Sequence, residues 1–218
     1  MQKQEKVAMP HQPQLGKRLE RADLSVLGGL DPEEPARGLQ LTGDGTGLDL
    51  WGRELEGCLL EGVRLAGADL GRWGLTDVAL CRCDLSGADL TEARMVRVRL
   101  EDCRLEGVQL GEAFLLDTTF QGCRMDYAQL SRGRMKRVLF SRCNLAGAAL
   151  QQMRHTGWRL EECDLRRAEL FGTPLEGLDL TTDQLEGIVV RIQDLAGARV
   201  TALQAAGLAK LMGLVVES

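Results

Sequence analysis

A five-residue period dominates this chain. From Leu50 to Leu180 every fifth position holds Leu, Met or Phe, and His155 is the only exception. A second register, two residues earlier, runs from Cys58 to Leu178 and contains no charged residue. The other three positions of each five carry nearly all of the charge and the glycine. Because internal repeats determine an architecture before secondary structure is assigned, this period is the strongest constraint on the fold.

A period of five fits neither regular element alone, since apolar residues recur about every 3.6 positions in an α-helix and every 2 in a strand. Within each five, however, two apolar residues are spaced by two, as on one face of a strand. The next two positions would turn a corner, and Gly is frequent at the second of them. Four such units make a square coil, and stacked coils pair their backbones about 4.8 Å apart. The pattern predicts an all-β solenoid of the β-helix type.

The repeated units resemble the A(D/N)LXX signature of pentapeptide-repeat proteins. The units that carry this resemblance are Ala68-Asp69-Leu70, Cys83-Asp84-Leu85, Ala88-Asp89-Leu90, Cys143-Asn144-Leu145 and Cys163-Asp164-Leu165. The resemblance implies a right-handed quadrilateral β-helix of pentapeptide repeats, and the C-terminal residues predict a short α-helical cap. Reading every fourth unit then gives the core columns, and one of these columns predicts that Phe120 and Phe140 stack in adjacent coils.

Both ends of the chain depart from the regular period. We expect residues 1–17 to be a flexible tail, and residues 18–49 to be a degenerate first coil and N-terminal cap. The β-helix spans 50–200, regular to 180 and irregular over 181–200, where 182–185 resembles one helical turn and 188–192 a strand. Residues 201–218 are predicted to form a helix over 201–212, with Thr201 as its N-cap, followed by a terminal apolar strand.

The C-terminal segment also predicts self-association. Family members with a helical cap and a terminal strand use them as a dimerisation module, so the resemblance implies a homodimer formed through the C-terminus. A monomeric plug that closes the last coil is the alternative. Surplus apolar residues would lack cover in a monomer. The candidate interface residues are Leu203, Leu208, Leu211, Leu214, Val215 and Val216.

Composition and charge restrict the location and the class of partner. The formal net charge of −5 and the 4% of aromatic residues argue against direct nucleic-acid binding. No stretch approaches the length of about 18 apolar residues that a membrane span needs, and the N-terminus lacks an apolar signal core. Seven cysteines, an odd number, suit reduced thiols better than a disulfide framework. These features predict a cytoplasmic protein that does not contact membranes.

No constellation of residues predicts chemistry. Cys83, Cys103, Cys123, Cys143 and Cys163 form an inward column, which we interpret as packing rather than as a metal or redox site. Cys81 should face outward, as an incidental thiol or a reactive one. His155 occupies a core column, as an imidazole bonded to the backbone or as part of a local site. With no nucleophile, phosphate loop or metal-ligand spacing, we expect no catalytic, cofactor-binding or metal-binding residues and no enzyme activity.

Two outer faces differ in charge. The acidic face carries Asp69, Asp89, Glu92, Glu112 and Glu169. The basic and apolar face carries Arg94, Arg97, Phe114, Leu116, Arg134 and Arg137. Charged residues on a face are most often only solvated, but an apolar patch with arginines at its rim is a common interface composition.

The family resemblance implies a function for the acidic face. Pentapeptide-repeat proteins of this length include quinolone-resistance and toxin-immunity proteins that act as mimics of duplex DNA. The resemblance therefore implies a non-enzymatic protein that binds DNA gyrase or topoisomerase IV and protects it from inhibitors. The modest acidic charge and the basic stripe depart from that pattern. The alternative is a scaffold or interaction module that contacts another protein through the basic and apolar face.

Overall fold

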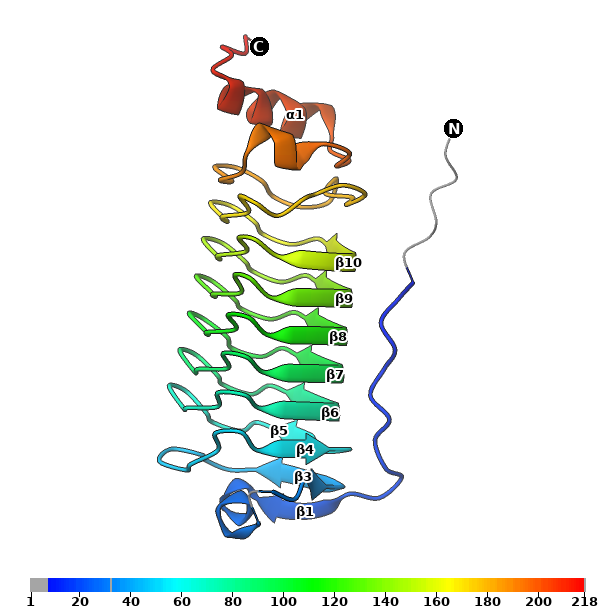
Figure 1. Ribbon diagram of the computed structural model, residues 1–218, viewed down its shortest axis with the longest axis vertical. Coiled ribbons are helices and arrows are strands. Elements are labelled where there is room, and N and C mark those ends of the chain that lie inside the picture. Colours follow the sequence, from blue (N-terminus) through cyan, green and yellow to red (C-terminus); the bar gives the residue numbers. More distant parts are fainter. Residues whose placement is uncertain (1–7, 32, 218) are drawn as a thin grey trace.

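The chain forms one parallel β-solenoid with a short helix at its C-terminal end. The computed structural model describes residues 8–31 and 33–217. About seven turns stack along one axis, with β1 (Glu20–Asp23) near one end and α1 (Ala202–Ala209) at the other (Figure 1). The all-β solenoid with a helical cap that the five-residue period and the family resemblance predict is confirmed.

One parallel sheet runs along most of the solenoid, and beyond it the last coils are joined by isolated bridges. Along its regular part, each strand pairs with the equivalent strand of the next coil, so that Met95 lies between Leu75 and Leu115. The described strands are β1, β2 (Ala36–Arg37), β3 (Leu39–Thr42), β4 (Glu54–Glu56), β5 (Leu59–Glu61), β6 (Gly74–Cys81), β7 (Arg94–Glu101), β8 (Phe114–Gln121), β9 (Arg134–Ser141) and β10 (Arg154–Glu161). Isolated bridges, such as Asp69 with Asp89, join the remaining sides of the coils in the same register.

Each coil turns four corners, and a left-handed residue marks each corner. In one coil these residues are Arg72, Asp77, Arg82 and Gly87, with φ between 53° and 65°. From 52 to 177 every fifth residue has this conformation, whether or not it is glycine. A left-handed conformation costs a residue with a Cβ about 1–2 kcal/mol, so continuous backbone pairing must offset that cost at each such corner.

The core contains the two apolar registers that the sequence predicts. The side chains of Leu110, Val108 and Cys103 are at most 1% exposed. Phe120 and Phe140 stack with their ring centroids 4.7 Å apart and their planes 3° from parallel, which confirms the predicted pair.

Near the N-terminus, successive strands pair at a spacing of 19 residues instead of the regular 20. Glu20 pairs with Leu39 and Gln40 pairs with Leu59, whereas Leu59 pairs with Ala79 in the regular register. This shorter spacing places the buried residues Ala36 and Leu41 one position past the five-residue period of the later coils. A 3₁₀ helix, η1 (Leu24–Gly29), buries Leu24 and Leu27 against this end of the core.

Residues 8–17 lie outside the coils and run alongside the strands (Figure 1). Backbone N–H groups of this segment donate hydrogen bonds to Asp117 and Asp77, which belong to β8 and β6. Pro10 is buried, although its neighbours in the segment are exposed. The segment therefore contacts the solenoid far from its own position in the sequence.

The C-terminal part corrects three expectations. Residues 181–200 continue the coils, because Gln184, Val189 and Arg199 still pair with the equivalent residues of the coil before. Residues 182–185 therefore form a corner and a bridge and not a helical turn, and 188–192 contains a single bridge and not a strand. The five-residue phase persists at positions 185, 190, 195 and 200, which are all Leu or Val.

The cap itself follows its sequence signals. Thr201 and Gln204 form a capping box at the start of α1, and Gly213 (φ 77°) ends the helical segment after η3 (Lys210–Met212). A second 3₁₀ helix, η2 (Ile192–Leu195), precedes it. Residues 214–217 form no strand in this chain, which corrects the predicted terminal strand.

Candidate functional site

The acidic face is partly neutralised by arginines of neighbouring coils. Arg72 donates to Glu92 (Nε–Oε2, 3.1 Å), and Arg132 donates to Glu112 (Nη2–Oε1, 3.0 Å). All four side chains are at least half exposed, so each pair contributes little to stability. These pairs leave a surface of mixed charge at two of the five predicted acidic positions.

The remaining acidic residues belong to the turns. Asp69 accepts a hydrogen bond from the backbone N–H of Gly71 at 3.1 Å, and Asp89 accepts one from Thr91 at 2.8 Å. Half-buried Glu169 accepts a hydrogen bond from the side-chain amide of Gln151. Asp69 and Asp89 are the exposed carboxylates of this face without an arginine at ion-pair distance among the described residues.

The basic and apolar face contains a cation–π contact. The guanidinium carbon of Arg94 lies 5.3 Å from the centroid of the Phe114 ring. Phe114 and Leu116 are half-buried, and Arg134 is exposed. The structure therefore brings four of the predicted residues into one region along β7, β8 and β9: Arg94, Phe114, Leu116 and Arg134.

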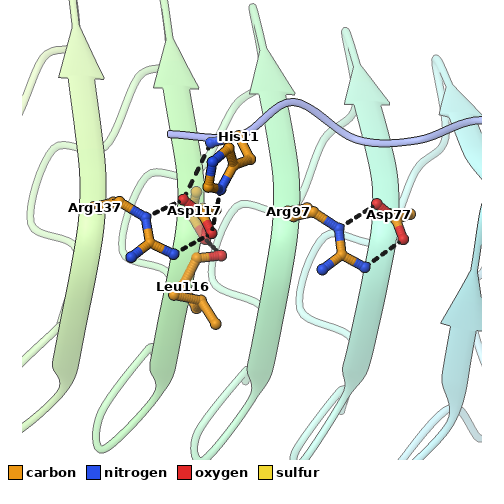
Figure 2. A network of polar contacts seen from close by, with 7 residues as sticks. His11, Asp77, Arg97, Leu116, Asp117 and Arg137 are labelled. Atoms are coloured by element: carbon orange, nitrogen blue, oxygen red, sulfur yellow. Dashed lines mark hydrogen bonds and ion pairs between the residues drawn. The ribbon is translucent and has the colours of Figure 1, made fainter. Parts of the chain in front are cut away.

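The other two predicted arginines of this face are engaged at a corner. Arg97 donates two hydrogen bonds to Asp77 (2.7 and 2.6 Å), and Arg137 donates two to Asp117 (both 2.6 Å; Figure 2). Burial of Asp117 acts to raise the pKa of its carboxyl, but hydrogen bonds from Arg137 and His11 outweigh it and hold that pKa well below the usual range. Asp117 is therefore a carboxylate at neutral pH.

Sequence reasoning missed Asp77 and Asp117, although a signal for them exists. Both lie in the same outer column as Arg97 and Arg137, so reading that column coil by coil gives Asp, Arg, Asp, Arg. Sorting the residues by net charge of a face hides this alternation. His11, which contacts Asp117, lies outside the period and carries no such signal.

The C-terminal segment exposes an apolar surface. Leu203, Val215 and Leu214 are 84%, 90% and 53% exposed. Leu211 and Val216 are also exposed, whereas Leu208 packs against the core. Side chains of this segment and of the last coil line a cavity of about 550 Å³. Five of the six predicted interface residues are thus available on the surface of the single chain.

The cysteine column is buried and leads to an unpredicted carboxylate. All seven cysteines are free, and each thiol of the column donates to backbone carbonyls, as Cys103 does to Glu101 and Leu80. The interaction with the neighbouring Cys123 thiol, together with burial, raises the pKa of Cys103 to about 12, so this thiol stays protonated at neutral pH. One coil beyond Cys163, the same column reaches Asp183, which is 5% exposed.

The two isolated candidates have local explanations. The Nε2 atom of His155 lies 2.5 Å from the carbonyl oxygen of Pro174, which can only accept, so Nε2 carries the proton. The His155 ring also packs edge-on against Trp158 at 5.2 Å. Burial raises the pKa of the Cys81 thiol, with a contribution from Glu101, so the thiolate form of Cys81 is disfavoured.

Residues 8–31 and 33–217 lack two other kinds of feature. No group of three or more His, Cys, Asp or Glu residues there could hold a metal ion. Among the helices of that part of the chain, none has the length and hydrophobicity that crossing a bilayer requires.

Comparison with solved structures finds other pentapeptide-repeat solenoids. A trypsin-treated form of QnrB1, a plasmid-mediated fluoroquinolone resistance protein, is 20% identical, with a TM-score of 0.44 over 92% of this chain and 98% of that chain. HetL, a pentapeptide repeat protein involved in heterocyst differentiation regulation in Nostoc sp. strain PCC 7120, is 22% identical, with a TM-score of 0.31 over 76% and 86% of the two chains. These similarities carry no information about function.

The family model gives a direct assignment. No curated protein sequence matches the chain. The model described as the pentapeptide repeat region matches residues 53–130 and, overlapping with them, residues 93–170. The two matches together cover more than half of the 218 residues. This protein therefore belongs to the pentapeptide-repeat proteins.

Proposed function

We propose that this protein acts by binding another protein along the outside of its solenoid, without catalysing a reaction. The observation that carries the proposal is the separation between inside and outside. Apolar side chains fill the interior, while the outer columns present charged residues at one coil spacing, about 4.8 Å. Such a surface is rigid before binding, which reduces the entropy lost on association.

The proposed partner is a type II topoisomerase, DNA gyrase or topoisomerase IV, and the proposed location is the cytoplasm. The support is the resemblance to quinolone-resistance pentapeptide-repeat proteins, together with a rod that carries exposed carboxylates along one face. In this proposal Asp69 and Asp89 mimic phosphates and enter the basic DNA-binding groove of the enzyme. Glu92 and Glu112 contribute less, because Arg72 and Arg132 already neutralise them.

A gyrase supercoiling assay, with and without a fluoroquinolone, tests this partner. The variant Asp69→Asn with Asp89→Asn removes two charges and keeps the oxygens that accept from Gly71 and Thr91. We expect weaker gyrase binding, less protection, and a loss of wild-type binding as salt rises that is steeper than that of the variant. Glu92→Gln with Glu112→Gln is the matched control, and its effect should be smaller. An absence of any wild-type effect on gyrase contradicts the proposed partner.

A second candidate is a scaffold that binds another protein through the basic and apolar face. The contact between Arg94 and Phe114, beside half-buried Leu116, favours this function because aromatic and Arg residues dominate binding energy at interfaces. The variant Phe114→Ala with Arg134→Ala should then abolish partner binding. If the same variant leaves gyrase protection intact, the two candidates are distinguished.

We also propose that two copies associate through their C-terminal segments. The support is the exposed apolar surface of Leu203, Leu211, Leu214, Val215 and Val216. The variant Leu203→Asp with Val215→Asp changes two highly exposed residues, so the folded chain should tolerate it while the dimer dissociates. Light scattering measures the mass, and a wild-type mass of one chain at micromolar concentration contradicts the dimer.

A further inference from the structure

One corner of the solenoid carries an alternating ladder of acidic and basic residues. The column is Asp77, Arg97, Asp117 and Arg137, one residue from each of β6 to β9 (Figure 2). The column holds Gly57 before this ladder and Gly157 after it, so the charged stretch covers four coils. All four residues have φ between 51° and 55°, the left-handed conformation that places their side chains on the outside of the corner.

Because aspartate and arginine alternate, equivalent groups in this column recur at every second coil instead of every coil. Each arginine is bound to the aspartate of the coil before it by two hydrogen bonds, which fix the carboxylate planes. The acceptor groups Asp77 and Asp117 are therefore two coils apart, a distance of about 9.6 Å at about 4.8 Å per coil. The Asp117 side chain is 4% exposed and that of Asp77 is 13% exposed.

Residues 10–14 match this repeat. The backbone N–H of His11 donates to Asp117 Oδ1 at 3.1 Å, and the backbone N–H of Gln14 donates to Asp77 Oδ1 at 2.9 Å. His11 Nδ1 adds a contact to Asp117 Oδ2 at 3.1 Å. A polyproline II chain rises about 3.1 Å per residue, so three residues span about 9.3 Å and return an N–H to the same side.

The two prolines of this segment have the same three-residue spacing. The rings of Pro10 and Pro13 fix φ at about −65°, a value that a polyproline II chain accepts, and a proline has no N–H to be left unpaired. Pro10 is buried and Pro13 half-buried against the solenoid. Outward side chains on both sides of the corner are also buried, and three of these four are apolar: Ala79 (1%), Val96 (8%), Thr119 (7%) and Leu139 (6%).

We propose that this corner is a docking site for an extended peptide with prolines at every third position, and that residues 10–14 occupy the site in cis. The two aspartates accept hydrogen bonds from backbone N–H groups three residues apart. The proline rings pack against the apolar side chains that flank the corner. A partner protein with an exposed Pro-x-x-Pro segment would displace the chain's own segment and gain access to the neighbouring Phe114 and Leu116. This proposal does not depend on the topoisomerase partner.

The first test asks whether the segment is docked in the wild-type protein. Amide hydrogen exchange of His11 and Gln14 should be slow, whereas that of Gln12, for which the structure gives no bond from the backbone N–H, should be fast. The variant Asp77→Ala with Asp117→Ala should bring all three amides to a common fast rate. If His11 and Gln14 exchange as fast as Gln12 in the wild type, the proposal is wrong.

The second test measures binding in trans. A fluorescent peptide with the sequence of residues 8–16 is titrated into the full chain carrying His11→Pro and Gln14→Pro, which removes both N–H donors from the cis segment. Faster trypsin cleavage after Lys17 verifies that the segment is released. We expect saturable binding to this released variant and much weaker binding to the wild type, whose site is filled.

Two controls make this result decisive. Adding Asp77→Ala and Asp117→Ala to the released variant should weaken peptide binding more than about tenfold, since two hydrogen bonds to charged groups are lost. A peptide that carries proline at the positions of His11 and Gln14 should not bind. Equal binding of the peptide to the wild type and the released variant, or no binding to a variant whose release is verified, overturns the proposal.

Discussion

The stability of this protein should rise as the pH falls from 7 to about 5, because of one buried carboxyl group. Asp183 ends the inward column of cysteines, and its side chain accepts a hydrogen bond from the backbone N–H of Cys163 at 2.7 Å. Its second oxygen, Oδ2, is buried and has no hydrogen-bond partner among the described residues. By contrast Thr173, also inward-facing, donates to Leu150 and accepts from Met153. The ionised form of Asp183 therefore destabilises the folded state.

The size of the effect follows from the pKa. Burial, opposed by the bond from Cys163, raises the pKa of Asp183 from 3.8 to about 6. Since a tenfold change in protonation corresponds to about 1.36 kcal/mol, this rise is equivalent to about 3 kcal/mol between the protonated and ionised forms. The folded state binds the proton more tightly than the unfolded state. The extra stability is fully present below about pH 4 and is lost as the pH rises through about 6.

Other carboxylates titrate in a different window. Hydrogen bonds from Arg97 keep the pKa of Asp77 low, and that of Asp117 is also lowered. Their contributions to stability are therefore present at neutral pH and are lost only as the pH falls below about 4. Between pH 5 and 7 the slope of stability against pH should report Asp183.

Urea unfolding at a series of pH values measures this slope. Asp183→Asn keeps an oxygen that can accept from Cys163 and removes the titration of this carboxyl, so the difference in slope between wild type and variant measures the contribution of Asp183. Asp69→Asn, an exposed change, is the control and should keep the wild-type slope. If wild type and Asp183→Asn show the same slope between pH 5 and 7, the argument from burial is refuted.

Three further substitutions test the core and the corners by thermal or urea unfolding. Leu110→Asp should prevent folding, because it buries an unpaired carboxylate. Thr91→Asp, an outward position on the same face of the solenoid, should change stability little. Equal stabilities of the two variants would contradict the assignment of inward and outward positions. Replacing Cys103, Cys123 and Cys143 together with Ala should lower stability while partner binding persists, and stoichiometric metal in the purified protein would argue against packing as their role. Gly107→Ala should cost about 1 kcal/mol from its φ of 66° alone, since a Cβ there meets no atom within 4 Å, and an unchanged melting temperature would show that such corners carry no strain.

The five-residue period predicts those features that repeat with it. It gives the inward registers, the Phe120–Phe140 stack and the corner positions, because each follows from stacking identical coils. The period also holds after residue 180, where it is less obvious in the sequence. Asp183 lies 20 residues after Cys163 and occupies the same inward position in the next coil. Positions 185 to 200 look irregular in the sequence because Val replaces Leu at two of them, although the backbone pairing continues.

Features outside the period could not be predicted in this way. His11 bonds to a residue 106 positions away, and nothing in the spacing of a short polar segment indicates which face it contacts. The ion pairs of the acidic face were missed for another reason. A count of charges per face treats Arg72 and Glu92 as opposing contributions, whereas the stacking of coils places them side by side as a pair.

The order of charges in an outward column limits which partners that surface can recognise, because it determines the distance between equivalent charged groups. A column that repeats the same charge in every coil presents one group about every 4.8 Å, the spacing of stacked strands. The alternation at Asp77, Arg97, Asp117 and Arg137 presents one acceptor about every 9.6 Å, which three residues of a polyproline II chain match and consecutive residues of a strand do not. Because the inward registers form the core, a change of one outward residue per coil can change this spacing without disturbing the packing of the core. The specificity of such a solenoid therefore depends on the order of charges along a column as well as on their sum over a face.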